Sequence, residues 1–386
     1  MYDPRAPIPP WMTEPHRLFA DTVRGFFREA LVPRIEAWRE AGIVERDFWR
    51  QAGEMGLLGA TIPEAFGGSG GPLSFDAITI YEQARAGDSG WGFSIQTIVA
   101  HYILAYGTDE QKARWLPRIA SGELICALAM TEPGTGSDVQ AIRTSARTEG
   151  DTYVVNGAKT FITNGQLANL VLLAVRTGPE PGARGVSLLA VETEGAEGFR
   201  RGRNLRKMGM KGADTSELFF EDVRVPKANL LGEIEGRGFG QLMKQLPWER
   251  LAIGVIGLGA SDHALAETLA YVKERKAFGK RIYDFQNTRF ELAEAKTKLE
   301  VTRSFIHDCV ARLDAGELDA ATASMAKWWA TQMQNEIADA CLQLFGGYGY
   351  MSEYPIANAF VDARVQKIYG GTNEIMKELI ARAMDD

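Results

Sequence analysis

The sequence Arg364-Val365-Gln366-Lys367-Ile368-Tyr369-Gly370-Gly371-Thr372-Asn373-Glu374, close to the C-terminus, places two adjacent glycines just before a predicted helix. Thr372 is a good N-cap for the apolar residues that follow at helical spacing, which are Ile375, Met376, Leu379 and Ile380. Backbone N–H groups left bare at such a helix start can bind an oxyanion. A glycine pair before a helix is also a common tight turn, and this stretch alone favours that simpler interpretation.

The composition describes a chain large enough for several packed layers. Its 386 residues predict two or three domains. The net charge of -7 and the sequence pI near 5.4 argue against a nucleic-acid partner. The three cysteines and four histidines are scattered, so we expect neither a disulfide framework nor a metal site.

The N-terminal stretch from Met1 to His16 is rich in proline and has no apolar segment. It predicts an extended arm rather than a signal peptide. No run of apolar residues is long enough for a membrane span. We therefore expect a cytoplasmic location.

The pattern of apolar residues changes twice along the chain. It is helical from about Pro15 to Cys126, where Thr108-Asp109-Glu110-Gln111 has the spacing of a capping box. Between Leu128 and Val225 it predicts strands at Tyr153–Val155, Thr160–Thr163, Leu170–Val175, Val186–Val191 and Glu217–Phe220, with Asn156-Gly157 as a hairpin between the first two.

After Gly240 the pattern returns to long helices, expected from Pro247 to about Lys273, from Gln286 to about Leu313, from Asp319 to Leu344 and from Thr372 onward. The predicted fold class is α+β and multidomain, with an N-terminal α-helical domain (1–127), a middle β domain (128–235) and a C-terminal α-helical bundle (236–386). No GxGxxG motif opens a βαβ unit, no Walker A motif occurs, and no GxSxG nucleophile elbow is present, which disfavours a Rossmann dehydrogenase or a serine hydrolase.

Two stretches near the predicted β domain can carry chemistry. In Met130-Thr131-Glu132-Pro133-Gly134-Thr135-Gly136-Ser137-Asp138 an apolar strand breaks into a loop of glycines and hydroxyls, which lets backbone approach a ring or a phosphate but also suits a plain linker. In Phe161-Ile162-Thr163-Asn164-Gly165, alternation predicts that Phe161 and Thr163 share one face of a strand. Both are also ordinary strand residues.

Two further stretches lie in the predicted bundle. Arg275-Lys276-Ala277-Phe278-Gly279-Lys280 ends a predicted helix, where the helix dipole favours cations without any ligand, although Arg275 can also hold a pyrophosphate. Gln343-Leu344-Phe345-Gly346-Gly347-Tyr348-Gly349-Tyr350 stops a predicted helix at its glycines, which is typical of a Schellman-type stop.

Taken in order, these stretches resemble the acyl-CoA dehydrogenases, FAD enzymes with an N-terminal α domain, a middle β domain and a C-terminal four-helix bundle. The two family signatures are matched by 130–138 and by Gln343 to Pro355. Leu246-Pro247-Trp248-Glu249-Arg250-Leu251 and Ile368 to Leu379 are most similar to the long-chain branch.

The resemblance implies which residues hold the cofactor and the substrate. Residues of the chain's own FAD site would be Met130, Thr131, Gly136, Ser137, Phe161, Thr163, Thr372 and Asn373. The adenosine diphosphate half would be reached from a neighbouring subunit of a homotetramer by Arg275, Phe278, Gln286, Gln343, Gly346 and Gly347. The acyl-CoA would contact Ser137, Arg250, Tyr369, Gly370 and Gly371.

One departure from the family pattern concerns the catalytic base. Many members have the catalytic glutamate directly after the tyrosine of the last motif, where this chain has Gly370. In the long-chain and isovaleryl branches a glutamate at the position of Glu249 does this work. Glu249 is expected in the first turn of a helix that begins at Pro247, where the dipole alone would stabilise it. The nearly apolar stretch from Leu251 to Ala260 predicts that Glu249 is buried, which would raise its pKa toward the range of a general base.

Two smaller departures affect the expected flavin environment. Phe161 stands where many relatives have tryptophan, and Asn358 stands where they often have a basic residue.

The implied activity is α,β-dehydrogenation of an acyl-CoA thioester in fatty-acid or branched-chain catabolism. Glu249 would remove the α proton, hydride would leave the β carbon for the flavin, and the Gly370 N–H with a ribityl hydroxyl would hold the enolate oxygen. Electrons would pass to an electron-transfer flavoprotein. Two alternatives stay open: an oxidase of the same fold, such as an acyl-CoA oxidase or nitroalkane oxidase, and a helical scaffold without catalysis. The acyl length is not predicted.

Overall fold

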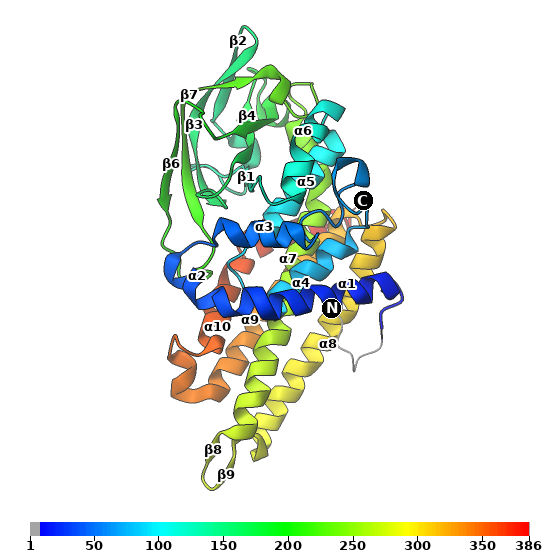
Figure 1. Cartoon of the computed structure of the whole chain (residues 1–386). Helices are drawn as coiled ribbons and strands as arrows, with labels where there is room; N and C mark the ends of the chain where they lie inside the picture. The colour runs from blue at the N-terminus through cyan, green and yellow to red at the C-terminus, as the bar shows by residue number, and fades with distance from the viewer. Residues whose placement is uncertain (1–7, 386) are drawn as a thin grey trace.

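The computed structural model describes residues 8–385, and Figure 1 shows a sheet domain at one end of an elongated helical body. The N-terminal helices are α1 (Glu14–Phe26), α2 (Ile35–Ala41), α3 (Arg46–Glu54), α4 (Ser74–Arg85), α5 (Phe93–Tyr106) and α6 (Asp109–Ala120). Thr108 accepts a hydrogen bond from the Gln111 N–H at 3.2 Å and closes the predicted capping box of α6. Because α1 begins at Glu14, the expectation of an extended arm is wrong for Glu14–His16, and Met1–Pro7 lie outside the described residues.

The middle domain is a mixed sheet in the order β1-β4-β2-β3-β7-β6, with β5 paired to β4. Its strands are β1 (Cys126–Ala129), β2 (Ser145–Glu149), β3 (Thr152–Thr163), β4 (Leu170–Arg176), β5 (Val186–Glu192), β6 (Phe199–Asn204) and β7 (Thr215–Pro226). Side chains of β4 alternate between two cores: Leu170 and Leu172 join the helical core, whereas Val171 and Leu173 join the core inside the sheet domain. This burial on both faces explains the continuous apolar run of β4.

The predicted hairpin at Asn156-Gly157 is wrong, because β3 runs through it as one strand. The pairing of β3 with β7 shifts register between Val155 and Gly157, so the glycine marks a β-bulge. The Asn156 side chain donates to Asp222 on β7 at 2.9 Å instead of forming a turn. We did not predict β2 and β6, because most of their residues are polar and at least partly exposed, so they lack the apolar pattern of a strand.

The C-terminal helices are α7 (Gly238–Glu274), α8 (Gln286–Asp314), α9 (Ala320–Phe345), α10 (Pro355–Gln366) and α11 (Asn373–Arg382). Figure 1 shows α7 running through the middle of the molecule, and it packs against α9 and α4. A side chain at Gly257 would come within 3.1 Å of the Ala330 carbonyl on α9, and one at Gly259 within 2.6 Å of the Tyr81 carbonyl on α4. These glycines let three helices pack closely.

Two details of the predicted bundle need correction. Helix α7 begins at Gly238, so Pro247 lies inside it and Glu249 is not in its first turn. Our prediction that the helix dipole stabilises Glu249 is therefore wrong. The basic cluster after α7 does more than end a helix: it forms a small hairpin of β8 (Lys276–Ala277) and β9 (Lys280–Arg281).

Across residues 8–385, none of the helices combines the length and apolar character needed to cross a membrane.

Candidate active site

Glu249 is a buried carboxylate on α7, with 6% of its surface exposed. Burial raises its pKa to about 7, against the opposing effects of a hydrogen bond from Tyr102 and the positive charge of Arg250. The Tyr102 hydroxyl, on α5, donates to Oε1 of Glu249 at 2.7 Å. Near neutral pH this group can therefore both release and accept a proton.

Gly370 lies beside the same face of α7. Glu249 and Ile253 are four residues apart on the helix and so share a face. A Cβ built on Gly370 would lie 2.2 Å from Cδ1 of Ile253. The backbone of Gly370 is also left-handed, with φ +62°. The structure thus places Gly370 within one helical turn of Glu249 along α7, with a backbone conformation that favours glycine.

Arg250, next to Glu249, is also buried, and burial lowers its pKa. Its Nη1 donates to the Ser324 hydroxyl on α9 at 3.2 Å. Its Nε is buried and has no hydrogen-bond partner within residues 8–385. A buried donor of this kind costs free energy unless a ligand or a water supplies an acceptor.

Hydrogen bonds from Lys327 of α9 hold the loop from Tyr369 to Asn373 in place. The Lys327 ammonium donates to the Gly371 carbonyl at 2.7 Å and to Oδ1 of Asn373 at 2.9 Å. Thr372 accepts from the Ile375 N–H at 3.3 Å, which confirms the predicted N-cap. Nδ2 of Asn373 is buried without a partner in the described part of the chain.

A second buried lysine fastens the loop after β1. The Lys159 ammonium donates to the Met130 carbonyl at 2.9 Å and forms an ion pair with Glu132 at 2.9 Å. Glu132 also accepts from the N–H groups of Arg143 and Thr144 at 2.7 and 2.9 Å. The residues that follow, Gly136 and Ser137, are exposed on this anchored loop.

Phe161 and Thr163 stand at the end of β3. Phe161 has a left-handed backbone, φ +60°, at a second register shift between β3 and β7, and 67% of its surface is exposed. The regular alternation from which we predicted a shared face is therefore broken at Phe161. An aromatic ring held out to solvent by strained backbone is typical of a ligand contact.

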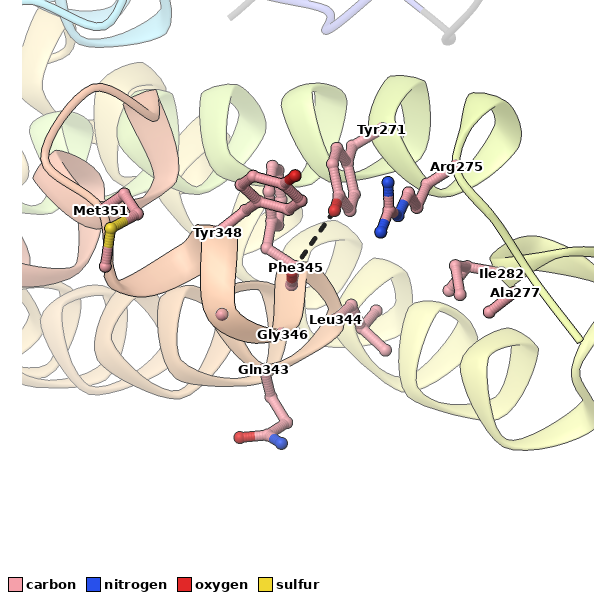
Figure 2. A pocket seen from close by; sticks show the side chains of 11 residues that line it. Tyr271, Arg275, Ala277, Ile282, Gln343, Leu344, Phe345, Gly346, Tyr348 and Met351 are labelled. Carbon is pink, nitrogen blue, oxygen red and sulfur yellow. Dashed lines mark hydrogen bonds between the residues drawn. The ribbon is translucent and has the colours of Figure 1, made fainter.

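The remaining predicted residues lie at the far end of the bundle. Arg275, Gln343, Gly346 and Gly347 line a cavity of about 600 Å³, in which the Arg275 guanidinium lies 5.3 Å from the ring centre of Tyr348 (Figure 2). Gln286 begins α8 and is exposed. Gly346 ends α9 with φ +58° and ψ -137°, outside the left-handed helical region that the predicted Schellman-type stop requires.

Phe278 is at the tip of the β8–β9 hairpin and is 95% exposed. Figure 1 shows this hairpin at the end of the molecule opposite the sheet domain. From Glu249 to Arg275, α7 and its end span roughly 40 Å at 1.5 Å per residue. Within one chain, Glu249, Arg250 and the Gly370 loop therefore lie together. Arg275 and the other residues at the far end of the bundle lie apart from Met130, Ser137 and Phe161.

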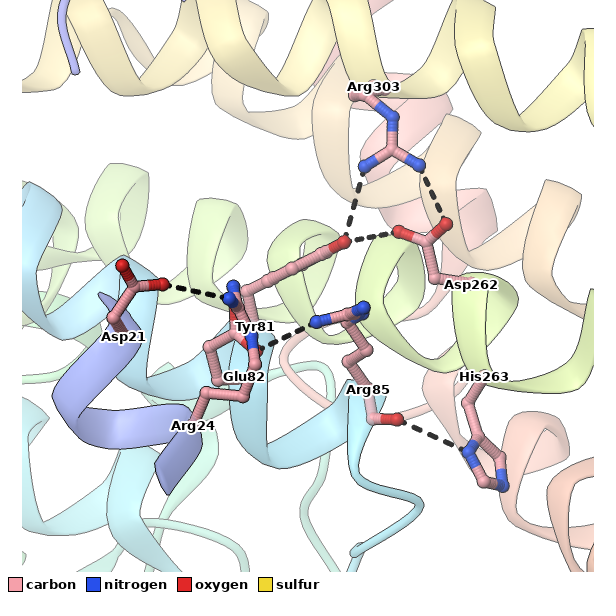
Figure 3. Close-up of polar contacts among 8 residues, drawn as sticks. All are labelled: Asp21, Arg24, Tyr81, Glu82, Arg85, Asp262, His263 and Arg303. Atoms are coloured by element: carbon pink, nitrogen blue, oxygen red, sulfur yellow. Dashed lines mark hydrogen bonds and ion pairs between the residues drawn. The ribbon is translucent and has the colours of Figure 1, made fainter. Parts of the chain in front are cut away.

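A second carboxylate, the partly buried Asp262, lies further along α7. It forms an ion pair with Arg303 of α8 at 2.7 Å and accepts a hydrogen bond from the Tyr81 hydroxyl of α4 (Figure 3). Arg303 also donates to the Tyr81 hydroxyl at 3.3 Å. The three side chains hold α4, α7 and α8 together, and this cluster is structural.

Sequence reasoning missed Tyr102, Lys159, Glu132 and Lys327. The only sequence signal for the two lysines was a single charged residue between uncharged neighbours, as in Ala158-Lys159-Thr160 and Ala326-Lys327-Trp328. Tyr102 carried no signal, because an aromatic residue in an apolar helix is an ordinary core residue.

Comparison with known proteins covers nearly the whole chain. Family models described as acyl-CoA dehydrogenase N-terminal, middle and C-terminal domains match residues 13–123, 127–223 and 236–385. The mitochondrial long-chain specific acyl-CoA dehydrogenase of Rattus norvegicus is 51% identical over 95% of this chain and 86% of its own length. The mitochondrial isobutyryl-CoA dehydrogenase of Dictyostelium discoideum is 37% identical over 97% and 90%.

The fold comparison agrees. The crystal structure of an acyl-CoA dehydrogenase from Geobacillus kaustophilus superposes with a TM-score of 0.96 at 44% identity, covering 98% of this chain and all of that one. The three-domain fold class and the resemblance to this family predicted from the sequence are thereby confirmed. With matches to all three domains, the chain belongs to the acyl-CoA dehydrogenase family of FAD-dependent oxidoreductases.

Proposed function

We propose that this protein oxidises an acyl-CoA thioester to the trans-2-enoyl-CoA, with Glu249 as the base and an electron-transfer flavoprotein as the electron acceptor. The observation that carries the proposal is the carboxylate of Glu249, buried beside the Gly370 loop in a chain that matches the family over nearly its whole length. Acyl-CoA dehydrogenation requires a base at the α carbon, and Glu249 supplies it.

The residues around Glu249 suit removal of an α proton. A pKa of about 7 lets the carboxylate take up the proton near neutral pH and release it again. As the proton leaves, negative charge develops on the thioester oxygen, and the Gly370 N–H stabilises it from a backbone held in place by Lys327 through Gly371. When bound, FAD supplies the acceptor for the hydride equivalent that leaves the β carbon.

The proposed FAD site fits the donors and surfaces present on the chain. The unpartnered Nδ2 of Asn373 and the exposed ring of Phe161 are suited to a polar, planar cofactor. Met130, Thr131, Gly136, Ser137, Phe161, Thr163, Thr372 and Asn373 would hold it in its own subunit. A Cβ on Gly346 or Gly347 would meet open space, so a ligand can approach that backbone directly.

A neighbouring subunit completes this site in our proposal. The exposed group of Arg275, Phe278, Gln286, Gln343, Gly346 and Gly347 is too far from the sheet domain of its own chain to join it. Each such group would contact the adenosine diphosphate half of the next subunit's FAD, in a homotetramer. On the substrate side, Ser137, Tyr369, Gly370, Gly371 and the unpartnered Nε of Arg250 would contact the acyl-CoA. The boundaries 1–127, 128–235 and 236–386 and the cytoplasmic location stay predictions.

The test combines FAD loading with turnover. The purified protein, supplied with excess FAD, is expected to bind about one FAD per chain. Its flavin absorbance should bleach when an acyl-CoA is added without oxygen and recover when an electron-transfer flavoprotein is added. A panel from short branched to long straight acyl-CoAs then identifies the substrate class. Rapid oxygen consumption without an added acceptor would favour an oxidase, and a protein that takes up no FAD would favour a scaffold.

A further inference from the structure

Tyr102 makes a side-chain contact with Glu249 from another domain. It lies on α5, is fully buried, and its hydroxyl donates to Oε1 of Glu249 at 2.7 Å. Within residues 8–385, no other hydrogen bond to this carboxylate is present. The orientation of Glu249 therefore depends on a residue of the N-terminal helices, not on its own helix.

The charged and titratable groups around Glu249 are few. Arg250 of α7 contributes positive charge, and Tyr102 of α5 contributes the hydrogen bond. Burial and the charge of Glu249 raise the pKa of Tyr102 well above its ordinary value, and Tyr106 on the same helix acts in the same direction. Tyr102 thus remains a neutral O–H donor, and a donor stabilises the ionised form of its acceptor.

We infer that Tyr102 is a positioning residue for the base, holding one carboxylate oxygen of Glu249 so that the other faces the substrate, and keeping the carboxylate ionised until it takes the α proton. This inference rests on the proposed function of Glu249. It adds that the contact between Tyr102 on α5 and Glu249 on α7 sets the pH range in which the enzyme is active. Burial raises the pKa of Glu249, and the hydrogen bond from the Tyr102 hydroxyl partly offsets that rise.

The test removes the hydroxyl and keeps the ring. In Tyr102→Phe, the acid limb of the profile of kcat/KM against pH should move up by about one pH unit, because a hydrogen bond to a charged acceptor is lost. Tyr106→Phe is the matched control. Its hydroxyl lies one turn along α5 and donates to the Gln241 carbonyl at 3.2 Å, so its profile should be unchanged.

A measurement without turnover separates positioning from general damage. The infrared band of the protonated Glu249 carboxyl can be assigned by its absence in Glu249→Gln, and its titration midpoint should rise in Tyr102→Phe. If that variant folds poorly, 3-fluorotyrosine at position 102 keeps the hydroxyl as a stronger donor and should move the midpoint down. Unchanged midpoints in both replacements would overturn the role of Tyr102. Full activity of Glu249→Gln would instead overturn the proposed base.

Discussion

Helix α7 carries two carboxylates with different surroundings, Glu249, which is buried, and Asp262, which is partly exposed. Each accepts a hydrogen bond from a tyrosine of the N-terminal helices, Tyr102 for Glu249 and Tyr81 for Asp262. Asp262 also has an ion pair with Arg303 at 2.7 Å, whereas Glu249 has no ion pair within residues 8–385. Asp262 is paired with Arg303 and helps to hold three helices together, whereas Glu249 is buried without an ion pair among the described residues and is left able to exchange a proton.

The largest expected effect is on catalysis. Glu249→Gln keeps the size of the side chain but cannot accept the α proton, so turnover should fall by roughly 10²–10⁴-fold while FAD stays bound. Asp262→Asn, on the same helix, is the control and should change turnover far less. Steady-state kinetics with FAD absorbance measure both. Undiminished turnover in Glu249→Gln would mean that another residue is the base.

The second largest effect is expected on stability and concerns Asp262. Arg303→Met removes the charge-assisted hydrogen bond to the partly buried Asp262, so the free energy of unfolding should fall by about 2 kcal/mol. Lys298→Met breaks the more exposed ion pair with Glu336 and should cost less than about 1 kcal/mol. Urea denaturation compares them. Equal losses would show that Asp262 is not the structural carboxylate of the pair.

The pH dependence of stability tests Glu249 itself. Its folded pKa of about 7 lies above the ordinary 4.5, so the folded protein binds this proton more tightly than the unfolded chain does. That contribution to stability is full below about pH 4.5 and is lost as the pH rises to about 7. Glu249→Gln should therefore be more stable than the parent protein at pH 8, by up to about 3 kcal/mol, and no more stable near pH 4.5. A gain independent of pH would contradict a raised pKa.

The smallest effect is expected at the exposed end of the same helix. Arg275→Ala should weaken FAD binding about tenfold, because a charge-assisted contact to the cofactor of a neighbouring subunit is lost. Lys273→Ala, two residues earlier, is the control. Fluorescence titration with FAD and light scattering report affinity and assembly together. A monomer fully loaded with FAD would contradict the shared site.

The sequence predicted the three-part order of helices and sheet because apolar periodicity and the loop motifs are local signals. It did not predict where α7 begins, because Gly238 to Leu246 lacks a clear start signal and Pro247 is a usual first residue of a helix. The bulge at Gly157 was taken for a hairpin, since Asn-Gly has the same local chemistry in both. The burial of Glu249 was predicted correctly from its apolar neighbours, but its partner Tyr102 was not, because 147 residues separate them and only the fold brings them together.

The contact between Gly370 and Ile253 has a consequence for how such enzymes diverge. A glutamate at position 370, where many relatives are expected to have it, would have to adopt a left-handed backbone that favours glycine, and its Cβ would displace the Cδ1 end of Ile253. A chain that acquired only that glutamate would have a strained backbone and a shifted Ile253 side chain next to its base. Moving the base between the two positions is therefore easier when several substitutions occur together, because the backbone at position 370 and the packing of Ile253 both have to adjust.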